Sequence, residues 1–394
     1  MTDTHNPLSG APTDFYNVFS DVSGEDLKAW QDAATFGEEI APHVNEAWEK
    51  ADYRIDLVER AGELDLLLDG IEIPGHRSMS RLAVGLVYME IARADASMGT
   101  ALAVQAGLAM QSIDQCGSQA QKDKYLDGMA KGEILGAFAL TEPDHGSDSV
   151  ALETSAVEDG DEWVINGEKK WIGQGSVGHI SVVWARMENG EVSGFIVPQD
   201  TPGYEAQTIE GKGGLRGIPQ AHIKFTDVRV PKENRLEGAN SFRDVAKVLT
   251  GTRSSVAWAA LGIAISSFET ALAYVKEREQ FGKPLAKMQL IQYRLGNMLQ
   301  DLTAMALYCR RLVNMEMDGT MTEQQASLAK VHNTRKARAI TSDARDMLGG
   351  VGMLLENHVM RNLADIEALH TYEGTDTIQN LIVGKEITGM SAYR

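Results

Sequence analysis

The residues best suited to chemistry lie near the carboxyl end of the chain, in Tyr372-Glu373-Gly374-Thr375. A carboxylate stands here between an aromatic residue and a glycine, just before a segment that can form a helix capped by Thr375 or Asp376. Partial burial disfavours the charged form of a carboxylate and raises its pKa, which gives a base that works near neutral pH. A solvated glutamate on a surface turn is the alternative, and the rest of the chain must decide between the two.

Three further segments carry weaker signals. The stretch Thr141-Glu142-Pro143-Asp144-His145-Gly146-Ser147-Asp148 could present N–H groups and hydroxyls to an anion, or could simply connect two elements. Arg278 could bind a phosphate and Phe281 could cover a flat ring, or both could belong to a helix-ending turn. Arg253 precedes a long apolar run, so its partner is either a core carboxylate or an anionic ligand.

One segment matches the residue pattern of a dinucleotide-binding fingerprint but not the structural context that the fingerprint requires. Residues 173–178 read G-x-G-x-x-G, but that fingerprint must open a helix inside a strand–helix–strand unit. The residues that follow, Ile180-Ser181-Val182-Val183-Trp184, are typical of a strand. The sequence therefore predicts a glycine-rich connection between two strands.

The composition describes a globular protein with a strongly acidic charge. The chain has 394 residues, 43% of them hydrophobic and 24% charged, which is enough for two or three domains. Its net charge of −19 argues against nucleic acid and against an anionic membrane surface, because both require clusters of Lys and Arg. An anionic substrate would have to be bound by local basic groups.

Targeting, membrane and metal signals are weak. The polar start of the chain does not resemble a signal peptide, and no apolar run reaches about 18 residues, so we expect a cytoplasmic protein without membrane insertion. Cys116 and Cys309 are predicted to be free thiols. The nine histidines are scattered and no pair has metal-ligand spacing, so no metal site is predicted.

The predicted secondary structure changes along the chain from helical to β and back to helical. The first block is rich in Ala, Leu and Met over residues 80–113, and the second contains short β-branched runs and an Asn166-Gly167 hairpin signal. In the third, apolar residues follow one stripe over 291–309, and Gly349-Gly350 ends a helix predicted over 324–348. We predict a flexible N-terminus (1–23), an N-terminal helical domain (24–136), a central β domain (137–238) and a C-terminal helical bundle (239–394).

These segments, in this order, resemble the acyl-CoA dehydrogenase family from about residue 23 to the end of the chain. One signature runs from Ala139-Leu140-Thr141-Glu142 to Gly146-Ser147-Asp148. The other runs from Asp346 to Met353 and continues with Glu356, Arg361 and Asp365. The subgroup that is most similar is that of glutaryl-CoA dehydrogenase. The resemblance implies an α+β fold with an N-terminal helical domain, a central β-barrel-like domain and a C-terminal four-helix bundle.

The same resemblance implies bound FAD, a homotetramer, and an electron-transfer flavoprotein as electron acceptor. Glu373 falls on the catalytic base of the family, which removes the α-proton of an acyl-CoA thioester while the β-hydrogen leaves as hydride to flavin N5. The forming enolate needs electrostatic stabilisation, which in the family comes from the main-chain N–H of this glutamate and an FAD ribityl hydroxyl.

Further positions are implied by the resemblance alone. The cofactor-binding positions are Phe138, Leu140, Thr141, Gly146, Ser147, Trp171, Ile172, Arg278, Gln280, Phe281, Asp346, Gly349, Gly350, Thr375 and Thr377. Of these, Arg278, Gln280 and Phe281 are expected to serve a neighbouring subunit. The substrate-binding positions are Ser147, Arg253, Gly99, Thr100, Tyr372 and Gly374.

Three departures from the family pattern bear on function. Gly173 replaces a threonine beside the flavin, which removes a hydroxyl contact, and His145 replaces a small residue. In glutaryl-CoA dehydrogenases an Arg followed by a Ser binds the distal carboxylate, and these positions are Gly99 and Thr100 here. A buried carboxylate without a cationic partner is strongly unfavourable, so we expect that the acyl chain is not a dicarboxylate.

The predicted activity is FAD-dependent α,β-dehydrogenation of an acyl-CoA with a short or medium, uncharged acyl chain. An acyl-CoA oxidase, a flavin monooxygenase on the same fold, or a true glutaryl-CoA dehydrogenase are alternatives among enzymes. A cofactor-free helical scaffold that binds partners is the alternative from a different class.

Overall fold

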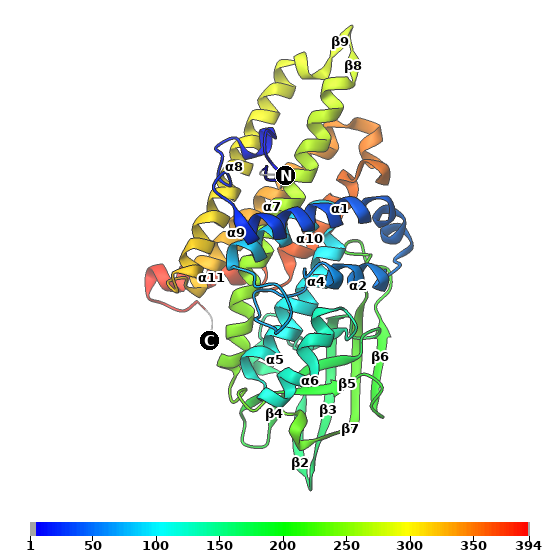
Figure 1. The fold of residues 1–394 in the computed structure, drawn as a ribbon, viewed down its shortest axis with the longest axis vertical. Coiled ribbons are helices and arrows are strands. Elements are labelled where there is room, and N and C mark those ends of the chain that lie inside the picture. The colour runs from blue at the N-terminus through cyan, green and yellow to red at the C-terminus, as the bar shows by residue number, and fades with distance from the viewer. Residues whose placement is uncertain (1–4, 393–394) are drawn as a thin grey trace.

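The computed structural model describes residues 5–392, in which a helical region, a β region and a second helical region follow one another along the chain (Figure 1). The predicted α+β fold class is confirmed. The strands form the lower part of Figure 1, the long C-terminal helices extend upward, and the N-terminal helices pack beside both. Residues 1–4 and 393–394, which belong to the predicted first and last segments, lie outside the described residues.

Polar caps divide the buried N-terminal helices. The Ser80 side chain accepts a hydrogen bond from the Ala83 N–H (3.1 Å) at the start of one helix, and Asp95 does the same for Met98 (2.7 Å) at the start of the next. The chain therefore breaks at Asp95 within an otherwise continuous apolar stretch. The elements of this region are α1 (Gly24–Lys50), α2 (Ile55–Glu63), α3 (Arg81–Ala94), α4 (Ala96–Leu102), the π-helix η2 (Ala103–Met110), α5 (Gln111–Cys116) and α6 (Gln119–Ala130).

The segment predicted to be a flexible N-terminus packs on the core from Leu8 to Val22 in the structure. Phe19 is only 1% exposed, and its ring lies 5.8 Å from those of Trp30 and Trp258. A short 3-10 turn, η1 (Pro12–Asp14), precedes it. The polar composition of this segment is a poor guide to its structure, because a few buried anchors, among them Leu8, Phe19 and Val22, hold it on the core.

The β region is a seven-stranded sheet in the order β1-β4-β2-β3-β7-β6, with β5 paired to β4. Alternate residues of the strands bury a compact apolar layer that includes Trp163, Phe195 and Ile223. The strands are β1 (Gly136–Ala139), β2 (Ser155–Asp159), β3 (Glu162–Gly173), β4 (Ile180–Met187), β5 (Val192–Pro198), β6 (Tyr204–Thr208) and β7 (Gln220–Pro231).

The hairpin turn predicted at Asn166-Gly167 is wrong. Strand β3 runs straight through these residues, and the register with β7 shifts there, as in a β-bulge. Gly167 has a φ of +142°, and a Cβ at this position would lie 2.6 Å from the Thr154 hydroxyl oxygen. The glycine therefore serves a bulge and a close approach, while the true turn between β2 and β3 lies at Gly160.

The rejection of the dinucleotide fingerprint is confirmed. Strand β3 ends at Gly173 and β4 begins at Ile180, so residues 173–178 connect two strands and open no helix. The side-chain amide of Gln174 donates to the Ala101 carbonyl (3.0 Å), which ties this connection to α4.

The C-terminal region is built around one long central helix. Helix α7 (Phe242–Glu277) packs against α3 and α9, and the buried stripe of α8 contains Met298, Leu302, Met305 and Cys309. The other elements are β8 (Glu279–Gln280), β9 (Lys283–Pro284), α8 (Gln289–Met317), α9 (Glu323–Met347), η6 (Gly349–Met353), η7 (Leu355–Asn357), α10 (Val359–Thr371) and α11 (Asp376–Thr388).

Helix α7 is the one described helix that is long and apolar enough to cross a membrane. About two thirds of its most apolar window (67%) is buried inside the protein, as expected of a core helix. Both cysteines, Cys116 and Cys309, are buried and free.

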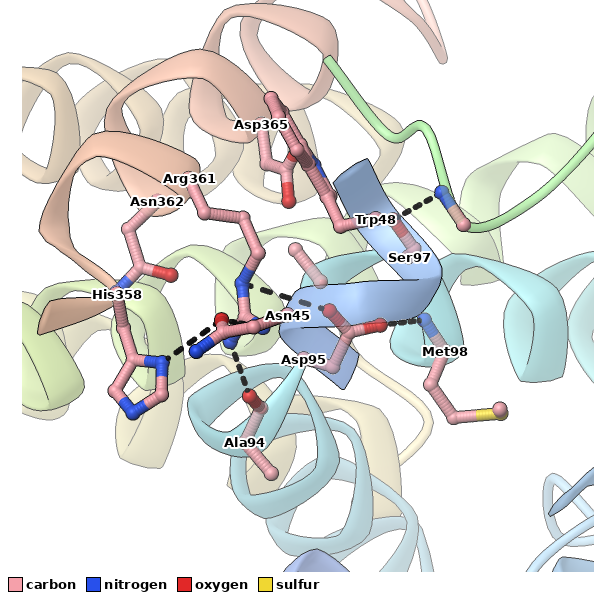
Figure 2. Close-up of polar contacts among 12 residues, drawn as sticks. Asn45, Trp48, Ala94, Asp95, Ser97, Met98, His358, Arg361, Asn362 and Asp365 are labelled. Carbon is pink, nitrogen blue, oxygen red and sulfur yellow. Dashed lines mark hydrogen bonds and ion pairs between the residues drawn. The ribbon is translucent and has the colours of Figure 1, made fainter. Parts of the chain in front are cut away.

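A buried polar junction joins the three regions (Figure 2). On α10, the Asp365 carboxylate accepts hydrogen bonds from the Trp48 indole of α1 (2.8 Å) and from the Leu215 N–H of the β6–β7 connection (2.6 Å). Arg361 of α10 bonds the Ala94 carbonyl (2.8 Å) and lies 3.7 Å from the Asp95 carboxylate. One guanidinium thus faces two buried carboxylates, so one of them is poorly compensated.

We expect Asp365→Asn to flatten the dependence of stability on pH. Burial, followed by the nearby Asp95 carboxylate, raises the pKa of Asp365 from 3.8 to about 7, against the opposing effects of its hydrogen bonds and Arg361. A carboxyl whose pKa is higher in the folded state loses stabilisation as pH rises from about 4 to about 7, by roughly 4 kcal/mol at most. Thermal unfolding of both proteins across this range should show the variant gaining stability relative to wild type.

The matched control is Asp21→Asn, which removes an exposed partner of Arg310 and should leave the pH dependence unchanged. Two other titratable groups near the junction are present in both proteins: Asp95, whose pKa is also raised by burial, and Lys212, whose pKa is lowered to about 8 by burial and which therefore titrates above this range. Parallel stability curves for Asp365→Asn and wild type would contradict the assignment.

Candidate active site

Glu373 lies on the short turn between α10 and α11, in a backbone conformation that glutamate adopts only under constraint. Its φ is +55°, and the next residue, Gly374, has a φ of +87°. The Thr375 hydroxyl caps α11 by accepting from the Ile378 N–H (3.4 Å), as predicted. Two consecutive left-handed residues followed by a cap fix the direction of the Glu373 side chain.

Two side chains, those of the buried Lys330 and of Gln379, donate hydrogen bonds to the main-chain carbonyls of this turn. The Lys330 ammonium of α9 donates to the carbonyls of Tyr372 and Gly374, on either side of the glutamate. The Gln379 side-chain amide donates to the Glu373 carbonyl (2.6 Å). Lys330 is 1% exposed, so burial lowers its pKa to about 8, while the charge of Glu373 acts in the opposite direction.

The Glu373 carboxylate accepts a hydrogen bond from Thr252 on the central helix α7. The Thr252 hydroxyl lies 2.7 Å from Glu373 Oε2 and also 2.9 Å from the Leu249 carbonyl oxygen. Since a hydroxyl carries one hydrogen, it can donate to only one of these two acceptors at a time. It can therefore donate to an ionised Glu373 or accept from a protonated one.

Burial raises the pKa of Glu373 above its ordinary value, and three neighbours oppose this rise. The largest opposing effect is the hydrogen bond from Thr252, followed by the charges of Lys330 and Arg253. Glu373 as a whole residue is half-buried. The result is a carboxylate that is more basic than a solvated one and still accessible to a ligand, as a general base requires.

The main-chain N–H of Glu373 has no acceptor within residues 5–392. The N–H of Tyr372 just before it bonds the Ala368 carbonyl (2.9 Å) and ends α10. An unpaired N–H next to a basic carboxylate is suited to bind an oxygen on which negative charge develops.

Of the predicted substrate-binding residues, Thr100 and Tyr372 lie together beside this turn. Burial raises the pKa of Tyr372, and the nearby Thr100 hydroxyl opposes the rise. Gly99 is buried at the contact between α4 and α3, and a Cβ there would lie 3.3 Å from the Ala92 Cβ. Position 99 thus serves close helix packing in this chain.

The structure answers only in part whether the partner of Arg253 is a core carboxylate or a ligand. Arg253 Nη1 lies 2.5 Å from a carboxylate oxygen of Glu323, so a carboxylate partner exists, but the Glu323 side chain is 42% exposed and does not belong to the core. Arg253 Nε, however, is buried without any hydrogen bond among the described residues. One face of the guanidinium is therefore still available to a polar group.

The loop over residues 141–148 is anchored by a buried ion pair. Lys169 of β3 is fully buried and donates to Glu142 Oε1 and to the Leu140 carbonyl, both at 2.9 Å. Although burial acts against it, the Lys169 charge holds the pKa of Glu142 at about 2. Gly146 and Ser147 beyond this anchor are exposed, while Phe138 and Leu140 before it are buried and offer little surface to a ligand.

The end of β3 presents an aromatic side chain on the surface. Trp171 has a φ of +67° and is 56% exposed, whereas Ile172 beside it is buried. A Cβ at Gly173 would lie 2.9 Å from a Val104 methyl group, which explains why a threonine does not fit here. The Thr141 carbonyl accepts from the Lys170 N–H (2.8 Å), so the 141–148 loop starts beside Trp171.

The remaining predicted cofactor positions lie apart from this surface. Arg278, Gln280 and Phe281 form the exposed β8–β9 hairpin at the upper tip of Figure 1, where Phe281 is 94% exposed. Asp346 is bound to Arg294 (2.8 Å), and Gly349 and Gly350 are exposed, with open space around each. Thr377 is exposed on α11.

Three residues of this site were missed by the sequence analysis: Thr252, Lys330 and Gln379. A usable signal existed for Lys330, which falls on the buried stripe of α9 with Ala326, Thr334 and Ala337. A lysine on an apolar stripe requires a specific partner. His145, singled out as a departure, lies 3.6 Å from the exposed Glu153. No group of three His, Cys, Asp or Glu that could hold a metal ion occurs within residues 5–392.

Comparison with known proteins assigns this chain to a family. Models of the N-terminal, middle and C-terminal domains of acyl-CoA dehydrogenase match residues 25–133, 137–228 and 242–388. The mitochondrial short-chain specific acyl-CoA dehydrogenase of Mus musculus is 35% identical over 345 residues, covering 86% of this chain and 83% of that protein.

Solved structures agree over nearly the whole chain. A glutaryl-CoA dehydrogenase from Mycobacterium smegmatis has a TM-score of 0.94 at 37% identity, covering 97% of this chain and 99% of that one. A glutaryl-CoA dehydrogenase structure from the same organism, in complex with FADH2, has a TM-score of 0.95 at 33% identity, covering 98% and 100%.

Proposed function

Because this chain belongs to the acyl-CoA dehydrogenase family, we propose that it is an FAD-dependent enzyme that dehydrogenates a short or medium, uncharged acyl-CoA. The observation that carries this proposal is the Glu373 turn. It combines a carboxylate of raised pKa with an unpaired main-chain N–H of the same residue. These are the two groups that removal of a weakly acidic α-proton requires, namely a base and a donor to the forming enolate oxygen.

The residues present fit an FAD. Trp171 exposes a flat indole from a constrained backbone position, next to the start of the 141–148 loop with its exposed Gly146 and Ser147. Those residues, with Thr141, would hold the flavin ring and pyrophosphate, and a similar glutaryl-CoA dehydrogenase structure contains FADH2. When bound, FAD supplies a hydride acceptor for the substrate β-hydrogen.

Glu373 would remove the α-proton, and Thr252 would keep the acid form in place. Before the reaction, the Thr252 hydroxyl donates to the ionised carboxylate. Afterwards, the protonated Glu373 can donate to Thr252, whose own hydrogen turns to the Leu249 carbonyl at 2.9 Å. The hydroxyl thus offers a hydrogen bond to both protonation states of the base.

Glutaryl-CoA should be a poor substrate, and butyryl-CoA a better one. Position 99 is a glycine packed on Ala92, so it supplies no guanidinium for a distal carboxylate. We expect anaerobic reduction of the FAD-loaded protein by butyryl-CoA to be at least about tenfold faster than by glutaryl-CoA, because a buried unpaired charge is costly. Faster bleaching by glutaryl-CoA would overturn this substrate assignment and favour a true glutaryl-CoA dehydrogenase.

The same experiment separates a dehydrogenase from an oxidase or monooxygenase. After reduction by substrate, a dehydrogenase that passes electrons to an electron-transfer flavoprotein should stay reduced for minutes when air is admitted. Immediate reoxidation with hydrogen peroxide release would support the oxidase instead. A purified protein that binds no flavin would support the scaffold alternative. The cytoplasmic location is likewise a prediction that fractionation of the source cells would test.

A homotetramer is supported by exposed apolar side chains of the C-terminal region. The β8–β9 hairpin projects from the protein with Phe281 at its turn, as a residue that reaches into a neighbouring subunit would. Further apolar side chains of this region are also at least half exposed, namely Leu290, Tyr293, Met353, Leu354, Ile387 and Met390. In such an assembly Arg278, Gln280 and Phe281 would complete the FAD site of a neighbour.

A further inference from the structure

A cavity of about 380 Å³ lies between the central helix α7 and the N-terminal helices. Its walls come from the segment before α3, from η2 and α5, from α7, and from the end of α8. Residues that matter for its chemistry are Asp69, Arg81, Gly107, Gln111 and Glu316. A cavity in this place with so many polar walls is unexpected for a site that takes a plain alkyl chain.

The cavity adjoins the catalytic turn through Gly107. A Cβ at this glycine would lie 3.7 Å from the Thr252 methyl group, and Thr252 bonds Glu373 directly. The same Cβ would lie 3.6 Å from Asp69 Oδ2 and 3.1 Å from the Tyr88 hydroxyl oxygen. The space beside Gly107 is therefore bordered by Thr252, which binds the base, and by the two polar groups.

Both polar groups are buried and have an unpaired atom. Asp69 is 6% exposed and Tyr88 is 5% exposed. Asp69 Oδ1 and the Tyr88 hydroxyl make no hydrogen bond of ordinary geometry within the described residues, although Arg81 Nη1 approaches Asp69 Oδ1 to 3.6 Å and the Tyr88 hydroxyl faces the same carboxylate. Buried polar atoms are rarely left without a partner, so this pair indicates that a ligand group supplies one.

The charges around the cavity identify that group. Arg81 is already bound to Glu316 (2.7 Å) and to the Asp69 carbonyl (2.8 Å), so its charge is neutralised. Three carboxylates (Asp69, Asp114 and Glu316) and two cations (Arg81 and Lys247) line the cavity, and Lys247 already faces the Asp244 carboxylate (3.5 Å). A carboxylate ligand is therefore disfavoured. Burial, then the nearby Asp69 carboxylate, raises the pKa of Tyr88, so its hydroxyl remains a neutral donor.

We propose that the far end of the acyl chain carries a hydroxyl group, which donates to Asp69 and accepts from Tyr88. A hydroxyl satisfies both unpaired atoms at once, because it offers one donor and an acceptor. An ammonium group would suit Asp69 but has no lone pair for Tyr88, and an alkyl end satisfies neither. This inference rests on the proposed dehydrogenase function and names the class of acyl chain within it.

The test compares matched CoA esters on the FAD-loaded protein. Butyryl-CoA and hexanoyl-CoA are each paired with the ω-hydroxy derivative, and kcat/KM is measured with an artificial electron acceptor. We expect the hydroxylated member of at least one pair to be preferred about tenfold or more, because a site built to bind a hydroxyl rejects the analogue that lacks it. Tyr88→Phe should abolish most of that preference.

The control is Tyr125→Phe, which changes a buried tyrosine of α6 outside the cavity and should leave the preference intact. A wild-type preference for both plain alkyl esters would overturn this inference while the proposed function stands. Equal loss on both members of a pair in Tyr88→Phe would also overturn it, because the cavity would then bind a part common to all CoA esters. If no CoA ester reduces the flavin, the proposed function itself fails.

Discussion

Replacing Glu373 with Gln should reduce turnover by at least about a thousandfold while flavin and acyl-CoA still bind. Glutamine keeps the shape of the side chain and can still accept from Thr252, but it cannot take up a proton. A positioned acid–base group contributes roughly 10²–10⁴-fold, and here no second carboxylate is hydrogen-bonded to Thr252 within the described residues. Steady-state turnover with butyryl-CoA, alongside FAD content and ligand affinity, measures the effect.

The matched control is Glu367→Gln on the preceding helix. Glu367 lies on α10 before that turn, its side chain is half exposed, and it pairs with Arg338 (2.7 Å). Its replacement should change turnover by less than about twofold. If Glu373→Gln kept more than about a thousandth of wild-type turnover, another group would have to be the base.

Lys330→Met should produce the second largest change, expressed in the pH profile. Methionine has a similar length but cannot donate to the Tyr372 and Gly374 carbonyls, so the turn that carries Glu373 loses its support. The variant also loses a positive charge that holds the Glu373 pKa down. Since the base must be ionised, the acidic limb of the kcat profile should move to higher pH, and kcat at neutral pH should fall roughly tenfold or more.

Lys336→Met provides the comparison, because Lys336 lies on the same helix and pairs with Asp301 (2.9 Å) near the surface. Its pH profile should coincide with that of wild type. A Lys330→Met enzyme that lost activity without any shift of the acidic limb would show that the lysine supports the fold only. That outcome would contradict the claim that the Lys330 charge lowers the pKa of Glu373.

Features that depend on neighbours in the sequence could be predicted well. The cap at Thr375, the glycine-ended helix α9 and the strand connection over 173–178 all follow from local backbone chemistry. Asn166-Gly167 is the exception, because the same dipeptide suits a β-bulge when another segment of the same chain, here at Thr154, packs closely against it. Local preference alone does not distinguish these two uses.

Features that depend on convergence of distant segments could not be predicted from single residues. Thr252 and Lys330 come from two different helices and meet Glu373 only because α7, α9 and α10 pack together. The polar pair Asp69 and Tyr88 gave no local signal either, since each is ordinary in its own segment. The family resemblance identified the base, but the groups that tune and hold it became visible only in three dimensions.

The most direct test of the central claim isolates the proton transfer from the hydride transfer. tert-Butylacetyl-CoA has α-hydrogens but no β-hydrogen, so it can lose an α-proton without reducing the flavin. Incubated with the FAD-loaded protein in deuterium oxide without oxygen, it should take up deuterium at the α-carbon with wild type and not with Glu373→Gln, as mass spectrometry would show. Equal deuterium uptake with both proteins would mean that Glu373 is not the base.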